Sequence, residues 1–91
     1  MAAAFHLHIC SMTGDFYEGE CVSLTLPLSD GELGLLANHS PVSAAVVPGA
    51  LRCRLPAGAG VRAVVGHGLA RFAENEALVL VEAIEGNASK E

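Results

Sequence analysis

The fold class is decided by residues 51–62, LRCRLPAGAGVR. Leucine and cysteine alternate there with Arg52 and Arg54, which gives an extended strand one apolar and one charged face. The small residues at 56–60 form a flexible connection, so the strands around Arg54 and Arg62 can pair as a hairpin. This segment therefore predicts a β-sheet with one buried face.

The same alternation recurs outward along the chain, in residues 5–10 and 22–26. Residues 77–81, ALVLV, are instead apolar on both faces. Such a run is typical of a strand that protein covers on each side, and it can also meet a partner. The strands are short, and no helical stripe lies between them.

Turn residues separate these runs. Asp30-Gly31 and Pro48-Gly49 are the clearest pairs, because proline fixes φ and glycine tolerates the positive φ of tight turns. Short strands divided in this way predict an all-β fold of two packed antiparallel sheets. We expect this sandwich over residues 1–85, followed by a polar tail at 86–91.

Composition narrows the class of function. A chain of 91 residues fits one small domain, and its net charge of -5 with only five Lys and Arg argues against nucleic-acid binding. The N-terminus lacks a basic region, and no apolar run is long enough to cross a bilayer. Charged residues make up only 16%, which a permanent partner on part of the surface would explain. The alternative is that the abundant alanine, which packs anywhere, inflates the hydrophobic fraction of 52%.

The cysteines and histidines raise the question of chemistry. Cys10, Cys21 and Cys53 lack C-x-x-C spacing and are interpreted as reduced, buried thiols. His6, His8 and Cys10 occupy alternate strand positions, so three potential metal ligands share one face. No fourth ligand is identified, so this face is interpreted as a polar or partner-facing surface that holds no structural metal.

Other catalytic patterns are weak. A Ser or Cys nucleophile paired with His39 or His67 has no supporting local motif. The spaced glycines at 31–34 and 66–68 precede no helix that could hold a phosphate, so they are interpreted as turns. The residues alone indicate a β-sandwich interaction module without a cofactor.

The order of the motifs resembles the N-terminal domain of the F-type ATP synthase ε subunit, from Phe5 to about Ile84. The segment NHSP at 38–41 is similar to the family's usual His-Ala-Pro, whereas His8, Cys10 and His67 depart from its pattern. The other motifs that carry the resemblance are FHL at 5–7, FYEGE at 16–20, LP at 26–27, DGELGLL at 30–36, PGALR at 48–52, VGHGLA at 65–70 and ALVLV at 77–81.

The resemblance implies a non-catalytic rotor subunit in the central stalk, with a sandwich of about ten short strands. It implies contact with the γ subunit through Ser11 and His39 and with the c-ring through the segment 29–38, and no catalytic residue or cofactor. The c-ring-facing residues would be Ser29, Asp30, Gly31, Glu32, Leu33, Gly34 and Asn38. The subunit would couple proton translocation to ATP synthesis on the cytoplasmic face of a bacterial plasma membrane, attached only through the complex. The family's two-helix C-terminal domain has no counterpart in this sequence.

The segment 29–41 is expected to project from the sandwich as a loop. Asp30 and Glu32 place charges between two apolar strand patterns, and Gly31 permits a tight excursion of the backbone. Glu32 is expected to be exposed and able to pair with a basic group of the c-ring.

Two alternatives from other classes remain open. One is a small metalloenzyme that uses His6, His8 and Cys10. The other is an unrelated β-sandwich binding module for carbohydrate or peptide, which the 4% aromatic content and the absence of Trp disfavour.

Overall fold

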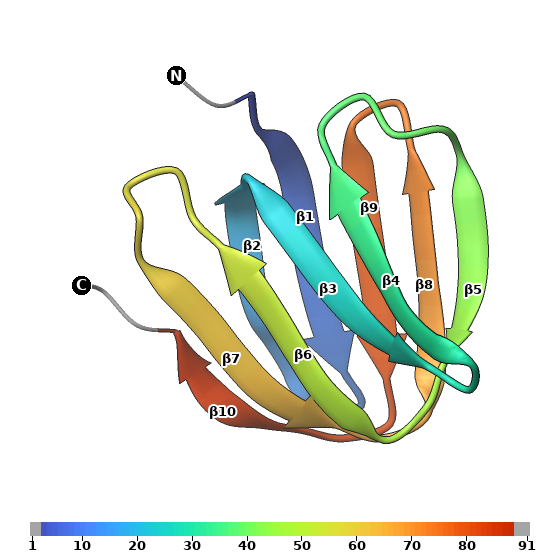
Figure 1. Cartoon of the computed structure of the whole chain (residues 1–91). Coiled ribbons are helices and arrows are strands. Elements are labelled where there is room, and N and C mark those ends of the chain that lie inside the picture. The colour runs from blue at the N-terminus through green and yellow to red at the C-terminus, as the bar shows by residue number, and fades with distance from the viewer. Residues whose placement is uncertain (1–2, 89–91) are drawn as a thin grey trace.

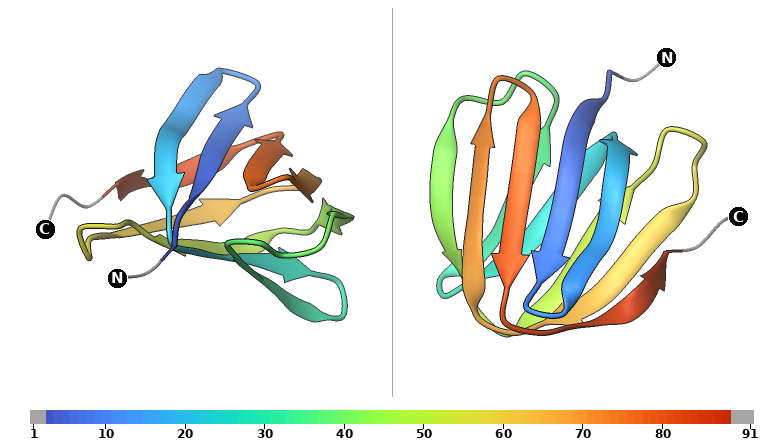
Figure 2. Two further views of the ribbon diagram at one scale, coloured as in Figure 1. Left: turned by 90° about the horizontal axis from the view of Figure 1, so that it is seen from above. Right: turned by 180° about the vertical axis from the view of Figure 1, so that it is seen from behind.

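The computed structural model describes residues 3–88, which form ten strands. These are β1 (Phe5–Ser11), β2 (Gly14–Cys21), β3 (Ser23–Leu28), β4 (Gly31–Leu36), β5 (Val42–Val46), β6 (Gly49–Arg54), β7 (Gly60–Val65), β8 (Gly68–Ala73), β9 (Glu76–Val81) and β10 (Ile84–Ala88). They make two five-stranded sheets, sheet 1 with the order β2-β1-β9-β8-β5 and sheet 2 with the order β10-β7-β6-β3-β4. Sheet 2 lies in front in Figure 1, and sheet 1 is nearest the viewer in the view from behind in Figure 2. The predicted all-β, two-sheet sandwich is confirmed.

The core lies between the sheets, where inward-pointing side chains from alternate strand positions meet. Strands β6, β7 and β9 bury every second residue over most of their length, as the alternating pattern predicts. Phe5 of β1 and Phe72 of β8 pack edge to face with ring centroids 5.3 Å apart. Cys21 and Cys53 are buried as predicted, but Cys10 is only half-buried, on the outer face of sheet 1.

Sheet 1 is mixed rather than wholly antiparallel, which corrects one part of the prediction. Strand β1 runs parallel to β9, with Leu7 opposite Ala77 and Ile9 opposite Val79. A tight turn forces antiparallel pairing on strands that are neighbours in sequence, but most of the chain separates β1 from β9. Alternation with a period of two residues does not indicate whether neighbouring strands run parallel or antiparallel, so the pattern alone could not predict this pairing.

Strand β9 is covered by this chain on one face only. Leu78 and Leu80 are 38% and 47% exposed on the outer face of sheet 1, while Ala77, Val79 and Val81 are buried. The interpretation of residues 77–81 as covered on both sides by the chain itself is therefore wrong. Contact with a partner stays a prediction.

Within the segment 29–41, which was predicted to project as a loop, residues 31–36 are instead one arm of a hairpin. Only Ser29 and Asp30 form the turn, and Gly31 follows with a φ of 136°. Strand β4 then pairs along its length with β3 and buries Leu35. Gly31, Gly34 and the charges obscured a strand whose leucines alternate as strand residues do.

Strand β10 extends past residue 85, where the sequence predicted the end of the sandwich. It pairs with β7, with Ile84 opposite Val65 and Gly86 opposite Ala63. An edge strand needs only its backbone for this pairing, so no apolar alternation marked it. Residues 89–91 of the predicted tail lie outside the described residues. Within residues 3–88 there is no helix long and apolar enough to cross a bilayer.

Candidate functional site

The outer face of sheet 1 carries exposed apolar side chains, which we call the outer apolar surface: Met12, Leu69, Leu78 and Leu80. Leu69 is 64% exposed and lies directly opposite Leu80 across the β8–β9 pair. Met12, in the turn after β1, is 84% exposed and lines a shallow depression together with Leu69 and Leu80. Contiguous exposed apolar patches mark sites of interaction with a protein or a ligand.

Ser11, an expected γ-subunit contact, lies at the end of β1 beside this surface. It lines the same depression as Met12 and Leu80. Its hydroxyl lies 3.0 Å from the Thr13 hydroxyl and accepts a hydrogen bond from the Thr13 backbone N–H at 3.3 Å. The local turn therefore holds the Ser11 side chain in place.

His39, the other expected γ-subunit contact, lies at the opposite end of sheet 1. Its ring packs edge to face on Phe72 with centroids 5.9 Å apart, and its Nδ1 donates to the Ser40 carbonyl at 2.7 Å. Asn38 beside it is held by Asn75, whose side-chain oxygen accepts from the Asn38 backbone N–H at 2.6 Å. The ring is half-buried, so contacts within this chain hold it in position.

The expected c-ring-facing residues do not share one end of the molecule. Ser29, Asp30 and Glu32 lie at the β3–β4 turn, whereas Asn38 follows the far end of β4, about 17 Å along the strand. Glu32 is exposed as predicted, yet it already has a partner in this chain. Its two carboxylate oxygens lie 3.4 Å from the two terminal nitrogens of Arg52.

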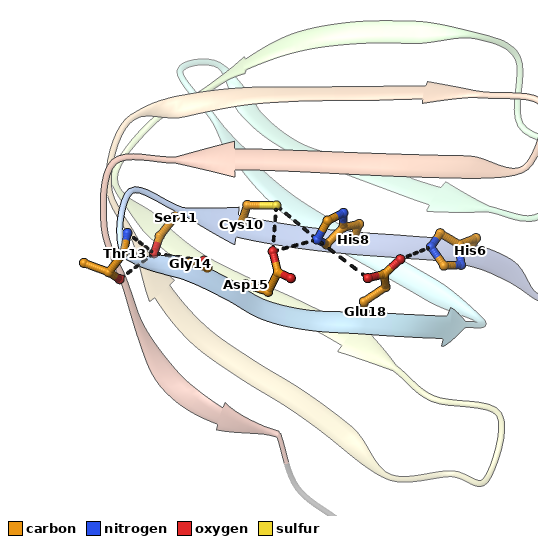
Figure 3. A network of polar contacts seen from close by, with 8 residues as sticks. All are labelled: His6, His8, Cys10, Ser11, Thr13, Gly14, Asp15 and Glu18. Atoms are coloured by element: carbon orange, nitrogen blue, oxygen red, sulfur yellow. Dashed lines mark hydrogen bonds and ion pairs between the residues drawn. The ribbon is translucent and has the colours of Figure 1, made fainter.

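A polar cluster joins β1 and β2 on the outer face of sheet 1, and we call it the β1–β2 cluster: His6, His8, Cys10, Asp15 and Glu18 (Figure 3). His8 Nε2 lies 2.9 Å from Asp15 Oδ1 and 3.2 Å from Cys10 Sγ. The Cys10 thiol also donates to Asp15 Oδ1 at 3.5 Å. Glu18 joins the two histidines, with one oxygen 3.1 Å from His6 Nε2 and the other 3.9 Å from His8 Nε2.

The members of this cluster alter one another's proton affinity. Partial burial, followed by the hydrogen bond to Asp15 and the charges of Asp15 and Glu18, raises the pKa of the Cys10 thiol. The hydrogen bonds from His8 and Cys10 lower the pKa of Asp15. Sequence reasoning found His6, His8 and Cys10 but missed both carboxylates, because pairing between β1 and β2 brings them there.

Comparison with known proteins decides the family. Residues 4–87 match the family described as ATP synthase, Delta/Epsilon chain, beta-sandwich domain. The chain belongs to this family. This confirms the resemblance and rules out an unrelated β-sandwich module. Epsilon chains are non-catalytic subunits of the synthase, so membership also argues against the small metalloenzyme.

Curated relatives named ATP synthase epsilon chain come from bacteria and chloroplasts. Those of Ruminiclostridium cellulolyticum and Nitratiruptor sp. are 34% identical over 83 residues and 32% identical over 88 residues. The chloroplastic chain of Coffea arabica is 36% identical over 81 residues. These matches cover 91%, 93% and 87% of this chain but only 61%, 68% and 61% of the relatives, so the chain spans about two thirds of their length.

Solved structures show the same fold at lower identity. A chain in the cryo-EM structure of the Euglena gracilis mitochondrial ATP synthase, OSCP/F1/c-ring, superposes with a TM-score of 0.87 at 18% identity, covering 94% of this chain and 55% of that one. A chain in the Tetrahymena thermophila mitochondrial ATP synthase central stalk and c-ring gives 0.76 at 13% identity, covering 92% and 67%.

Proposed function

We propose that this chain is a non-catalytic rotor subunit of an F-type ATP synthase, which binds the γ subunit and the c-ring and couples proton translocation to ATP synthesis. The epsilon chains among its relatives support this role, as does the likeness to a chain in a structure titled as a central stalk and c-ring. The subunit acts at the cytoplasmic face of the bacterial plasma membrane and is attached only through the complex. The subunit acts mechanically, through the surfaces by which it contacts other subunits.

The γ subunit docks on the outer apolar surface, and this surface is the observation that carries the proposal. Leu69 and Leu80 offer apolar area to a partner, and Ser11 lies beside them. Burying such area is the main favourable term in a permanent interface. His39, at the other end of β8, extends the contact along the sheet.

The c-ring meets the β3–β4 turn. Ser29, Asp30, Gly31 and Glu32 cluster at this end of the molecule and present carboxylates to the polar ends of the c subunits. Asn38 lies at the other end of β4, so a flat ring surface that touches Asp30 does not reach it. Leu33 and Gly34 act as the strand that supports the turn.

The test is copurification of the chain with γ from cells that express both. Leu69→Glu should abolish the complex, because it places a charge within the apolar contact. Val64→Glu is the matched control, since Val64 is also 64% exposed on a strand but lies on the outer face of sheet 2. The melting temperature of each free variant shows that the fold is kept. Normal copurification of Leu69→Glu, or equal loss with both variants, would contradict this docking face.

A further inference from the structure

The β1–β2 cluster assembles the donor set that the sequence alone left incomplete. One imidazole nitrogen, one thiol and one carboxylate oxygen converge from His8, Cys10 and Asp15 (Figure 3). A candidate fourth donor, the Glu18 carboxylate, lies 3.9 Å from His8 Nε2 but outside the group of three, whose donor atoms all lie within 4.8 Å of one another. These atoms come from two paired strands, so the backbone of sheet 1 holds them together.

The spacing of these donors fits a tetrahedral ion. Zinc bonds of about 2.0–2.1 Å to nitrogen or oxygen and about 2.3 Å to sulfur set the ligand atoms roughly 3.3–3.6 Å apart. In the cluster the nitrogen–oxygen, sulfur–nitrogen and sulfur–oxygen separations are 2.9, 3.2 and 3.5 Å. An ion therefore needs only small outward rotations of the half-buried His8 and Cys10 side chains and of the exposed Asp15 side chain.

A β-bulge places the carboxylate beside the thiol. The register of β1 and β2 shifts between Ile9 and Cys10, so that Ile9 is opposite Tyr17 while Cys10 is opposite Asp15. Phe16 is the extra residue, and both it and Tyr17 pack against the core. Without this shift the alternation would turn Asp15 away from the face that carries Cys10. Bulges commonly re-aim a side chain in this way at a site.

His6 orients the carboxylate of Glu18, the candidate fourth donor. Its Nε2 lies 3.1 Å from one oxygen of Glu18, which leaves the other oxygen toward His8. Outer partners of this kind fix the geometry of a ligating carboxylate and tune the affinity of a metal site.

We propose that the β1–β2 cluster binds one zinc-class divalent transition-metal ion, with His8, Cys10 and Asp15 as its first three ligands. Glu18 reaches the fourth position by a rotation of its side chain toward the ion, and His6 orients its carboxylate. A mixed set of imidazole, thiolate and carboxylate suits zinc, cobalt or copper and is a poor site for magnesium or calcium. The inference does not depend on which subunits the chain binds.

The ion is not a requirement for folding. The ligands point outward from β1, while Leu7 and Ile9 on its other face are fully buried in the core. Binding should therefore raise the melting temperature of an already folded chain, because the ion binds the native state in preference to the unfolded one. A chelator should remove this increment without unfolding the protein.

The experiment titrates the full 91-residue chain with Zn²⁺ by calorimetry and with Co²⁺ by absorption spectroscopy. We expect one ion per chain and, with Co²⁺, a sulfur-to-metal charge-transfer band that excess Mg²⁺ leaves in place. Cys10→Ser should remove this band although Cys21 and Cys53 remain. Asp15→Asn should weaken Zn²⁺ binding by more than tenfold, and His6→Ala by about 10–100-fold as the loss of an outer partner.

Two matched control variants test whether metal binding is specific to the β1–β2 cluster. Glu20→Gln changes a carboxylate of β2 that pairs opposite His6 yet makes no contact with the proposed ligands, and His67→Ala removes an exposed histidine elsewhere. Both should bind as the wild type does. Absence of Zn²⁺ binding to a chain that melts cooperatively, or binding that survives Cys10→Ser and His8→Ala, would overturn the inference.

Discussion

Cys10 is the one of the chain's three thiols that solvent reaches, since Cys21 and Cys53 are buried. Its pKa is raised by partial burial and by its contact with Asp15. Because the thiolate is the nucleophile, we predict slow alkylation by iodoacetamide near neutral pH. Asp15→Asn removes the acceptor and its charge, which should lower the thiol pKa and speed alkylation several-fold.

The measurement is the alkylation rate against pH, followed by mass spectrometry in metal-free buffer. The Asp15→Asn profile should rise at lower pH than the wild-type profile, while Glu20→Gln should leave it unchanged. Superimposable profiles for wild type and Asp15→Asn would show that Asp15 does not control this thiol.

At the scale of elements, the sequence predicts which residues form strands better than how strands meet. Alternation in residues 51–62 predicted β6 with its buried Leu51 and Cys53, and the hairpin with β7, because period-two burial and short hairpins are local. The parallel β1–β9 pair and the bulge beside Cys10 were not predictable from periodicity, because they depend on long-range pairing. The same limit hid Asp15 from the candidate site and made β4 resemble a loop.

The β3–β4 turn offers a test that separates fold from coupling. Glu32→Lys places a second cation beside Arg52, with which Glu32 now forms an exposed ion pair. Losing such a pair costs about 0.2–1 kcal/mol of unfolding free energy, so the isolated domain should stay folded. In reconstituted vesicles the same change should reduce proton-driven ATP synthesis, because it reverses a charge that we propose to face the c-ring.

A charge swap distinguishes the two effects. Glu32→Lys combined with Arg52→Glu restores an ion pair within the domain and should recover the melting temperature. The swap leaves a cation at position 32, where we propose that the c-ring docks, so synthesis should stay low. Recovery of both properties together would mean that Glu32 acts only within this chain, and unchanged synthesis with Glu32→Lys would remove the turn from the c-ring contact.

At the scale of the whole molecule, one face of the sandwich favours self-association, whereas the net charge of the chain opposes it. The outer apolar surface of sheet 1 favours contact between free copies, whereas a charge of -5 on each chain repels them. Repulsion falls with salt, as the screening length drops from about 10 Å at 0.1 M to about 3 Å at 1 M. The attraction between the apolar surfaces does not weaken as the salt concentration rises.

We therefore predict that the isolated chain is monomeric at low salt and self-associates weakly at high salt. The association constant should rise on the order of tenfold, about 1.4 kcal/mol, between these conditions. Sedimentation equilibrium of the metal-free chain measures this directly. Leu69→Glu should remain monomeric at high salt because it interrupts the apolar surface, and Val64→Glu should associate as the wild type does. If high salt instead dissociated a complex that had formed at low salt, charge pairing would hold the copies together. The outer apolar surface would then not be the contact.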